Sequence, residues 1–156
     1  MKLSSTAFQN NGLIPTKYAH QGVTGGANIS VPLAWADVPP GTDSFALSII
    51  DPHPVANNWV HWFVINIPAL VTSLAEGASP TRMPPGAREL YTSYGEIGYG
   101  GPEPPKGSGP HPYVITLYAL SAPRLDCSVN ASRGAFLKSL EGRILASAVL
   151  TGVYER

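Results

Sequence analysis

The sequence predicts a mostly β protein in which two sheets pack face to face, with one or two short helices near the C-terminus. The chain contains 16 glycines and 16 prolines, dispersed between apolar runs rather than gathered in one tract. This distribution is typical of short strands joined by constrained loops. The strongest apolar runs are short and rich in β-branched and aromatic residues, which favour strands. Only one segment, near the C-terminus, has both the start and the stop signals of a helix.

The length and composition predict a single domain over residues 1–156. A chain of 156 residues suits one hydrophobic core. Apolar residues make up 44% of it and charged residues 13%, which indicates a globular rather than a disordered protein. The sequence has no internal repeat and no convincing linker.

The charge pattern weighs against two classes of partner. The formal net charge is zero and the basic residues are not clustered, whereas nucleic-acid and membrane-surface binding both rely on concentrated Lys and Arg. No segment approaches the length of a membrane span, and the N-terminus lacks the apolar run of a signal peptide. Cys127 is the single cysteine, so no intrachain disulfide forms. We therefore expect a cytoplasmic protein.

The N-terminal segment begins with weak strands. Residues 3–8 are expected to form an edge strand, and residues 12–28 a loop rich in glycine and asparagine. Residues 29–35 indicate a short strand that carries a proline, and residues 38–44 (VPPGTDS) a turn.

Two buried strands follow, over residues 45–51 and 59–68. The first, FALSIID, ends at an acid. The second, WVHWFVINIP, is apolar, β-branched and aromatic. Strict alternation along it predicts one face with Trp59, His61, Phe63 and Ile65, and the other with Val60, Trp62, Val64 and Asn66.

The C-terminal half is expected to open with a long loop over residues 69–112, a length that is usually functional in a compact domain. A buried strand follows at residues 113–120. Residues 130–143 form the predicted helix, with Asn130 as N-cap and Gly142 as terminator. Residues 145–155 have mixed character, and their Val, Thr and Tyr favour a strand.

Two motifs place ionisable side chains at the junctions between loops and predicted strands. In DPHPVANNWVHWFVINIP, residues 51–68, His61 interrupts an apolar strand soon after an Asp-Pro turn. In GYGGPEPPKGSGPHPYVITLYAL, residues 98–120, His111 follows a Gly/Pro loop and precedes another apolar strand. Glycines allow close approach of a ligand to the backbone, and prolines hold a loop in shape. These two loop–strand junctions are expected to converge on one pocket.

These motifs resemble the phosphatidylethanolamine-binding protein family, also called the Raf kinase inhibitor-like family, and its bacterial and archaeal branch in particular. The resemblance covers nearly the whole chain. It includes the segments NISVPLAW, VPPGTDSFAL, DPHP followed by WVHWFVINIP, GYGGPEPPKGSGPHPY and LYAL.

The resemblance implies a β-sandwich with a small anion pocket at one end, which binds phosphate, phosphate-bearing head groups or small carboxylates. It maps the pocket onto Asp51, Trp59, His61, Gly100, Gly101, Pro105, His111 and Tyr113. It also implies regulation of a kinase or a protease through an unnamed protein partner. We expect no cofactor and a binding protein rather than an enzyme; the oligomeric state stays open, with a homodimer as one option.

Two positions depart from the family pattern. The family usually has a second acid in the first motif, as DPDAP, where this chain has His53. It usually has an arginine after the second histidine, as HRY, where this chain has Pro112. We expect positions 53 and 112 to lie side by side, because the loss of both members of an ion pair would explain the joint departure.

The residue chemistry suggests how an anion would be held. His61 and His111 could supply N–H groups, Tyr113 an O–H, and the Gly100–Gly101 loop backbone N–H groups. Asp51 beside an anion is explained if it accepts a proton from His61 or from a protonated ligand oxygen, which would fix the tautomer of the imidazole and raise its pKa.

Three alternatives stay open. A histidine on a strand is often simply a satisfied core residue, and a tyrosine simple strand packing. A metal site would use Asp51, His53, His61 and His111, which are ligand types that zinc accepts, although the spacing matches no short metal motif. A hydrolase would use the Asp51–His61 pair to activate water or a serine in a nearby loop. The candidate serines are Ser93 and Ser108, and no GxSxG elbow is present.

Overall fold

The computed structural model describes residues 1–156 and contains two β-sheets. The small sheet consists of β1 (Lys2–Ser4), β3 (Leu33–Ala36) and β6 (Ser73–Leu74). The large sheet has the order β2-β9-β8-β4-β5-β7, formed by β2 (Gly12–Leu13), β9 (Ile144–Tyr154), β8 (His111–Leu120), β4 (Ser44–Asp51), β5 (Trp59–Pro68) and β7 (Arg88–Glu89). All pairings are antiparallel except that of β2 with β9. The mostly β, two-sheet prediction is confirmed.

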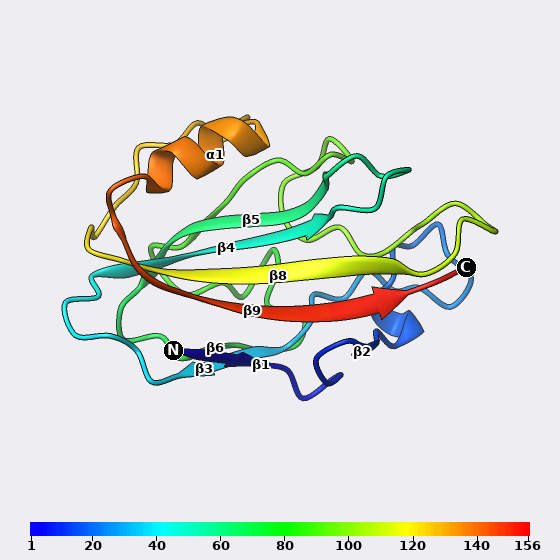
Figure 1. Cartoon of the computed structure of the whole chain (residues 1–156), viewed down its shortest axis with the longest axis horizontal. Coiled ribbons are helices and arrows are strands. Elements are labelled where there is room, and N and C mark those ends of the chain that lie inside the picture. Colours follow the sequence, from blue (N-terminus) through cyan, green and yellow to red (C-terminus); the bar gives the residue numbers. More distant parts are fainter.

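The small sheet covers one face of the large sheet, and helix α1 (Arg133–Leu140) covers the other (Figure 1). An inter-sheet core of 23 buried residues, including Trp35, Phe45 and Trp62, fills the space between the sheets. A second cluster lies under α1, where the rings of Phe63 and Phe136 stack at 4.1 Å. Burying both faces explains why the central strands are apolar almost throughout.

The predicted central strands are confirmed, and β9 confirms the preference for a strand at the C-terminal end. The weaker elements are shorter than predicted. Strand β1 covers only Lys2–Ser4, and β3 begins at Leu33, after Pro32. The two segments expected as loops contain short elements: β2 and the 3₁₀ helix Thr16–Tyr18 in one, β6 and β7 in the other.

The helix begins later than predicted, and its N-cap is Ser132 rather than Asn130. The Ser132 hydroxyl accepts a hydrogen bond from the N–H of Ala135 at 3.2 Å, which is the usual N-cap contact. The helix ends at Leu140, and Gly142 follows it with φ +71°, a conformation that favours glycine. With eight residues, this helix is too short to cross a membrane, and no other helix in the structure could do so.

Strand β5 bulges at His61. Ile49 pairs with Trp62 and Ile50 pairs with Val60, so one residue of β5 has no opposite partner. A bulge bends a strand and redirects the side chain at the extra position. The strict alternation predicted for this strand is therefore wrong here, because Val60 lies in the helix-side cluster with residues expected on the opposite face.

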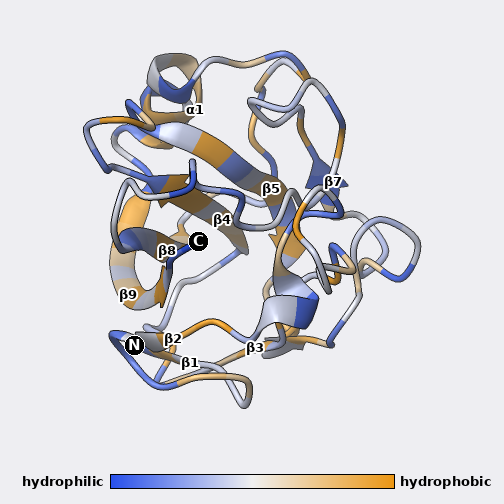
Figure 2. Ribbon diagram, turned by 90° about the vertical axis from the view of Figure 1, so that its right-hand side faces the viewer, coloured by the Kyte–Doolittle hydropathy of each residue, from blue (hydrophilic) through white to orange (hydrophobic).

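Figure 2 looks at the end of the molecule where the C-terminus lies, with apolar stretches on the strands of the large sheet. At this end β4 finishes, β5 and β8 begin, and the chain between residues 98 and 110 passes over them (Figure 1). The two motifs from distant parts of the sequence therefore meet at one end of the large sheet.

Candidate functional site

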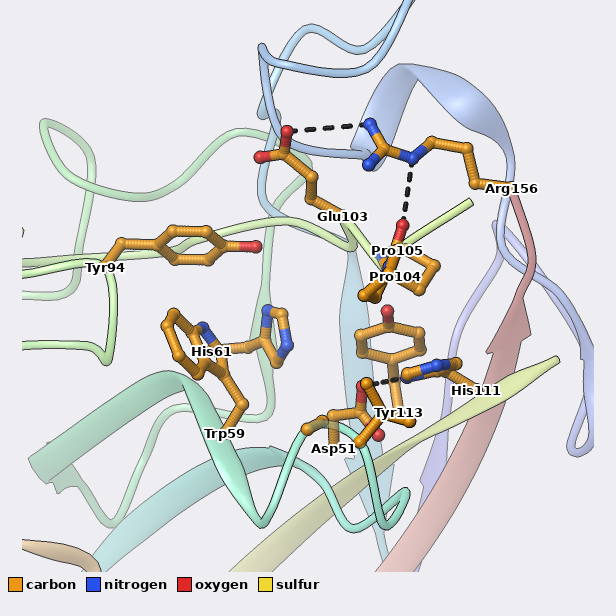
Figure 3. Close-up of a pocket in the computed structure, with 12 residues that line it drawn as sticks. Asp51, Trp59, His61, Tyr94, Glu103, Pro104, Pro105, His111, Tyr113 and Arg156 are labelled. Atoms are coloured by element: carbon orange, nitrogen blue, oxygen red, sulfur yellow. Dashed lines mark hydrogen bonds and ion pairs between the residues drawn. The ribbon is translucent and has the colours of Figure 1, made fainter. Parts of the chain in front are cut away.

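A cavity of about 510 Å³ opens at this end of the large sheet. Its walls include six of the predicted site residues: Asp51, Trp59, His61, Pro105, His111 and Tyr113 (Figure 3). It is also lined by residues that the sequence analysis did not select: Val55, Ala56, Tyr94, Glu103, Pro104 and Arg156. The convergence of the two motifs on one pocket is therefore present in the structure.

Asp51 is bonded to His111, not to His61. Its Oδ2 lies 2.6 Å from Nδ1 of His111, and both side chains are buried. Its Oδ1 accepts the N–H of His53 at 2.9 Å, a short-range Asx contact that explains the Asp-Pro turn. The carboxylate is thus engaged on both oxygens, and the expected Asp51–His61 hydrogen bond is wrong.

The protons around His111 can be assigned from its partners. The Ser108 hydroxyl lies 2.6 Å from the carbonyl oxygen of Pro105 and 2.9 Å from Nε2 of His111. A carbonyl only accepts, so the single hydroxyl proton points to Pro105, and Nε2 donates to Ser108. The contact of Nδ1 with Asp51 needs a further proton. The Asp51–His111 pair therefore shares one proton, has no net charge, and leaves no nitrogen of His111 free for a ligand.

His61 presents an acceptor to the cavity. Its Nδ1 donates to the carbonyl oxygen of Gly100 at 2.7 Å, and Nε2 makes no hydrogen bond within the chain. Burial lowers its pKa to about 4, outweighing the carbonyls of Gly100 and Gly101 and the carboxylate of Asp51, which raise it. The expected rise in the pKa of this imidazole is wrong, because burial outweighs a carboxylate that is already paired.

The two glycines lie behind the cavity wall, and neither lines the main cavity. The N–H of Gly100 donates to the carbonyl oxygen of His61 at 2.8 Å, and that of Gly101 to Oδ1 of Asn28 at 2.7 Å. Neither N–H is free for a ligand. A Cβ on Gly101 would lie 2.1 Å from the carbonyl oxygen of Tyr18, so glycine is required there by close packing rather than by ligand binding.

Tyr113 has a buried hydroxyl without a hydrogen-bond partner. Its ring meets that of His61 edge-on at 4.9 Å, and the hydroxyl end lies beside Pro104 at the cavity (Figure 3). Burial raises the pKa of Tyr113, so the group stays an O–H donor at neutral pH. An unpartnered buried hydroxyl is costly, and native proteins contain few of them.

Tyr94 and Trp59 form an aromatic wall opposite. Their rings meet edge-on at 5.5 Å, and the Tyr94 hydroxyl donates to the carbonyl oxygen of Gly101 at 2.9 Å. The Tyr94 ring also stacks on His20 at 4.4 Å. Tyr94 lies in the segment that the sequence predicted only as loop, and nothing in its spacing marked it as part of the pocket.

The rim carries an ionic cluster. Glu103 Oε2 lies 2.7 Å from Nδ1 of His20, and its Oε1 lies 3.6 Å from Arg156. Arg156 also donates through Nε to the carbonyl oxygen of Pro104 at 2.9 Å. Glu103 stands within the second motif and could have been selected from it, whereas Arg156 belongs to neither motif.

Of the two positions that depart from the family pattern, His53 lies in the loop between β4 and β5, and Pro112 is the second residue of β8. The ring of His53 stacks on that of His111, with centroids 3.8 Å apart, and Pro112 is the next residue along the chain. Ring stacking thus connects the β4–β5 loop with the start of β8 in this chain. The structure contains no group of three or more His, Cys, Asp or Glu side chains placed to hold a metal ion. Ser93 accepts the N–H of Val60 at 2.9 Å and does not line the cavity.

Fold and site together define a small two-sheet protein with a partly aromatic pocket at one end. A family model described as phosphatidylethanolamine-binding protein matches residues 4–155. The chain belongs to this family.

Individual relatives agree with that assignment. A UPF0098 protein of Methanothermobacter thermautotrophicus is 40% identical over 157 residues, covering 100% of this chain and 99% of the relative. The UPF0098 protein YbhB of Escherichia coli is 37% identical, with 99% of each chain covered.

Solved structures share the fold at similar identity. The crystal structure of E. coli YbcL, described as a new member of the mammalian PEBP family, has a TM-score of 0.92 at 35% identity, covering 99% of this chain and 98% of that one. The homologue CT736 of Chlamydia trachomatis has a TM-score of 0.84 at 34% identity, covering 99% and 97%.

Proposed function

We propose that the protein binds a small ligand through a phosphate or carboxylate group in the cavity at the ends of β4, β5 and β8. The observation that carries the proposal is the hydroxyl of Tyr113, which is buried, unpartnered and at the cavity. A ligand oxygen at this position would give the hydroxyl the partner it lacks within the chain. A largely apolar pocket with a few polar groups is the usual form of a small-molecule site.

Two further donors support an anionic ligand. Arg156 is a permanent cation that lines the cavity. The backbone N–H of Glu103 makes no hydrogen bond within the chain, and the two prolines that follow it have no N–H at all. The donors of this proposal are thus Tyr113, Arg156 and the N–H of Glu103, in place of the two histidines and two glycines expected from the sequence.

Regulation of a kinase or a protease is the finer part of the proposal and rests on the family resemblance. A partner whose binding depends on whether the cavity holds a ligand would contact the rim of the cavity, where Trp59 and Val55 are exposed. A Trp59→Ala variant whose loss of partner inhibition is much larger than its loss of ligand affinity would support it.

The hydrolase alternative is less well supported. Ser108, His111 and Asp51 form a hydrogen-bonded chain with the connectivity of a catalytic triad. A nucleophilic serine needs Nε2 of the histidine as proton acceptor, whereas here the hydroxyl proton points to Pro105 and Nε2 donates. Ser108 also does not line the cavity.

The test is calorimetric titration of inorganic phosphate and acetate into wild type, Tyr113→Phe and Tyr99→Phe. Tyr99 is the matched control, because its buried hydroxyl donates to the carbonyl oxygen of Tyr18 at 3.0 Å. We expect Tyr113→Phe to weaken binding by about fivefold to tenfold, the contribution of one hydrogen bond, without loss of stability. Tyr99→Phe should lose about 1 kcal/mol of stability and keep its affinity. Equal affinities in all three proteins would refute the role of Tyr113, and no binding to wild type would refute the proposed function.

A further inference from the structure

We infer that the cavity selects a phosphate group that still carries a proton, namely inorganic hydrogen phosphate or a phosphate monoester, over sulfate and phosphate diesters. The inference rests on the proposed function and narrows its ligand class. It follows from the proton positions around His61, the residue at the bulge of β5.

The orientation of the His61 ring determines which nitrogen carries its proton. The Gly100 carbonyl can only accept, so at 2.7 Å it requires a proton on Nδ1. The rings of Tyr113 and Tyr94 meet His61 edge-on at 4.9 and 5.7 Å and hold it in this orientation. In the neutral imidazole, Nε2 is then a lone-pair acceptor. His61 points into the cavity (Figure 3), so a ligand meets this acceptor.

The ionisable groups around His61 do not reverse this state. Asp51, at the end of β4, already shares a proton with His111, at the start of β8. His20 has a carboxylate partner in Glu103. Tyr94 and Tyr113 pack against the His61 ring, and burial keeps both protonated. Arg156 lines the same cavity and is a permanent cation, which disfavours a second positive charge on His61. Burial of His61 itself lowers its pKa to about 4, so Nε2 accepts throughout the neutral range.

Whether a ligand can pair with Nε2 of His61 depends on whether it carries an O–H group. Hydrogen phosphate and the monoanion of a phosphate monoester have a P–O–H group that can donate to Nε2, while their other oxygens accept from Tyr113. The sulfate ion and the phosphate group of a diester have only acceptor oxygens, so one of these oxygens would face the nitrogen lone pair. Leaving a buried acceptor unpaired against a charged ligand costs about tenfold to one-hundredfold in affinity.

The affinities of four esters distinguish the two possible sources of the phosphate group, a free phosphate compound and a lipid head group. Glycerol 3-phosphate is a monoester without an ammonium group, and phosphoethanolamine is a monoester with one. Dimethyl phosphate and glycerophosphoethanolamine are the corresponding diesters. Each is titrated calorimetrically at pH 6, together with inorganic phosphate and sulfate.

We expect inorganic phosphate and both monoesters to bind at least tenfold more tightly than sulfate and both diesters. Ammonium-bearing compounds that bind best whatever their ester class would overturn the inference, because the ammonium would then be the donor to His61. Equal binding of all six would also overturn it, while the proposed function would stand. If none binds, the proposed function fails.

The pH dependence of ligand affinity provides an independent test. A phosphate monoester loses its remaining proton above a pKa of about 6, whereas inorganic phosphate keeps one O–H and sulfate has none. Affinity for glycerol 3-phosphate should therefore fall between pH 5.5 and 8; a rise would contradict the inference. In His61→Gln the amide can donate, so the preference for phosphate over sulfate should shrink at least fivefold. A thermal melt shows whether this variant folds, and the wild-type comparisons decide the inference if it does not.

Discussion

Oδ2 of Asp51 and Nδ1 of His111 lie 2.6 Å apart, joining two strands whose residues are 60 positions apart in the sequence. Both side chains are buried, and the hydrogen-bond partners of His111 assign one proton to the pair. The pair is a structural connection at the cavity wall rather than a source of N–H groups for a ligand. The contribution of the Asp51–His111 pair to the free energy of unfolding can be measured.

Replacing Asp51 with asparagine should destabilise the protein by about 3 kcal/mol, because the proton shared with His111 loses its anionic partner in a buried site. Asp43 provides the matched control, since it is exposed and forms no salt bridge. Asp43→Asn should change stability by less than about 0.5 kcal/mol. Urea denaturation of the ligand-free proteins measures both. A similar small effect in the two variants would show that the Asp51–His111 pair adds nothing to stability.

Stability should depend on pH through His61. Its pKa is about 4 in the folded protein against an ordinary value of 6.5 for histidine, so the unfolded chain binds the proton more readily. The contribution of neutral His61 is complete above about pH 6.5 and is lost as the pH falls towards 4. A shift of this size corresponds to about 3 kcal/mol.

The measurement is the free energy of unfolding at several pH values between 7 and 4, for wild type and His61→Gln. Carboxylates contribute to acid sensitivity in both proteins, so the difference between the two curves isolates the histidine. We expect that difference to change across the interval; parallel curves would mean that burial does not hold His61 neutral.

Arg156 should contribute the main cationic interaction with the ligand. Arg156→Gln should weaken inorganic phosphate binding by about tenfold at low salt, the value of one charge-assisted hydrogen bond. The effect should shrink at high salt, because the guanidinium is partly exposed. Lys106 provides the control, because it is exposed and directly follows Pro105 of the cavity wall but does not line the cavity itself. Lys106→Gln should leave the affinity nearly unchanged, and equal losses in both variants would indicate attraction by overall charge only.

Gly101 should be intolerant of a side chain. A Cβ there would lie 2.1 Å from the carbonyl oxygen of Tyr18 and 2.6 Å from the backbone nitrogen of His20. Because these are backbone atoms that cannot move aside cheaply, we expect Gly101→Ala to lose at least about 3 kcal/mol of stability. Gly107 has φ +78° but nothing within 4 Å of the added Cβ. Gly107→Ala should therefore cost about 1 kcal/mol, from backbone strain alone. Equal losses by thermal denaturation would show that the close backbone contacts of Gly101 add no cost of their own.

Local patterns were sufficient for the main strands. Residues 45–51, 59–68 and 113–120 were predictable because β-branched and aromatic runs bounded by Gly and Pro favour strands whatever their partners. The helix was predictable for the same kind of reason, and its start was misplaced because Asn130 and Ser132 are both good N-caps. Only the contact of Ser132 with Ala135 distinguishes them.

The sequence by itself determined that two histidine-bearing motifs lie at junctions between loops and strands. The family resemblance added the prediction that these motifs form a ligand pocket. Tertiary structure decided the proton positions. Whether Asp51 bonds His61 or His111 depends on the register of β4 with its neighbours and on the bulge at His61, which no local pattern encodes. Likewise, Arg156 reaches the rim only because β9 runs alongside β8. Hydrogen-bond roles depend on distances between residues far apart in the chain, and those distances exist only after the sheets have packed.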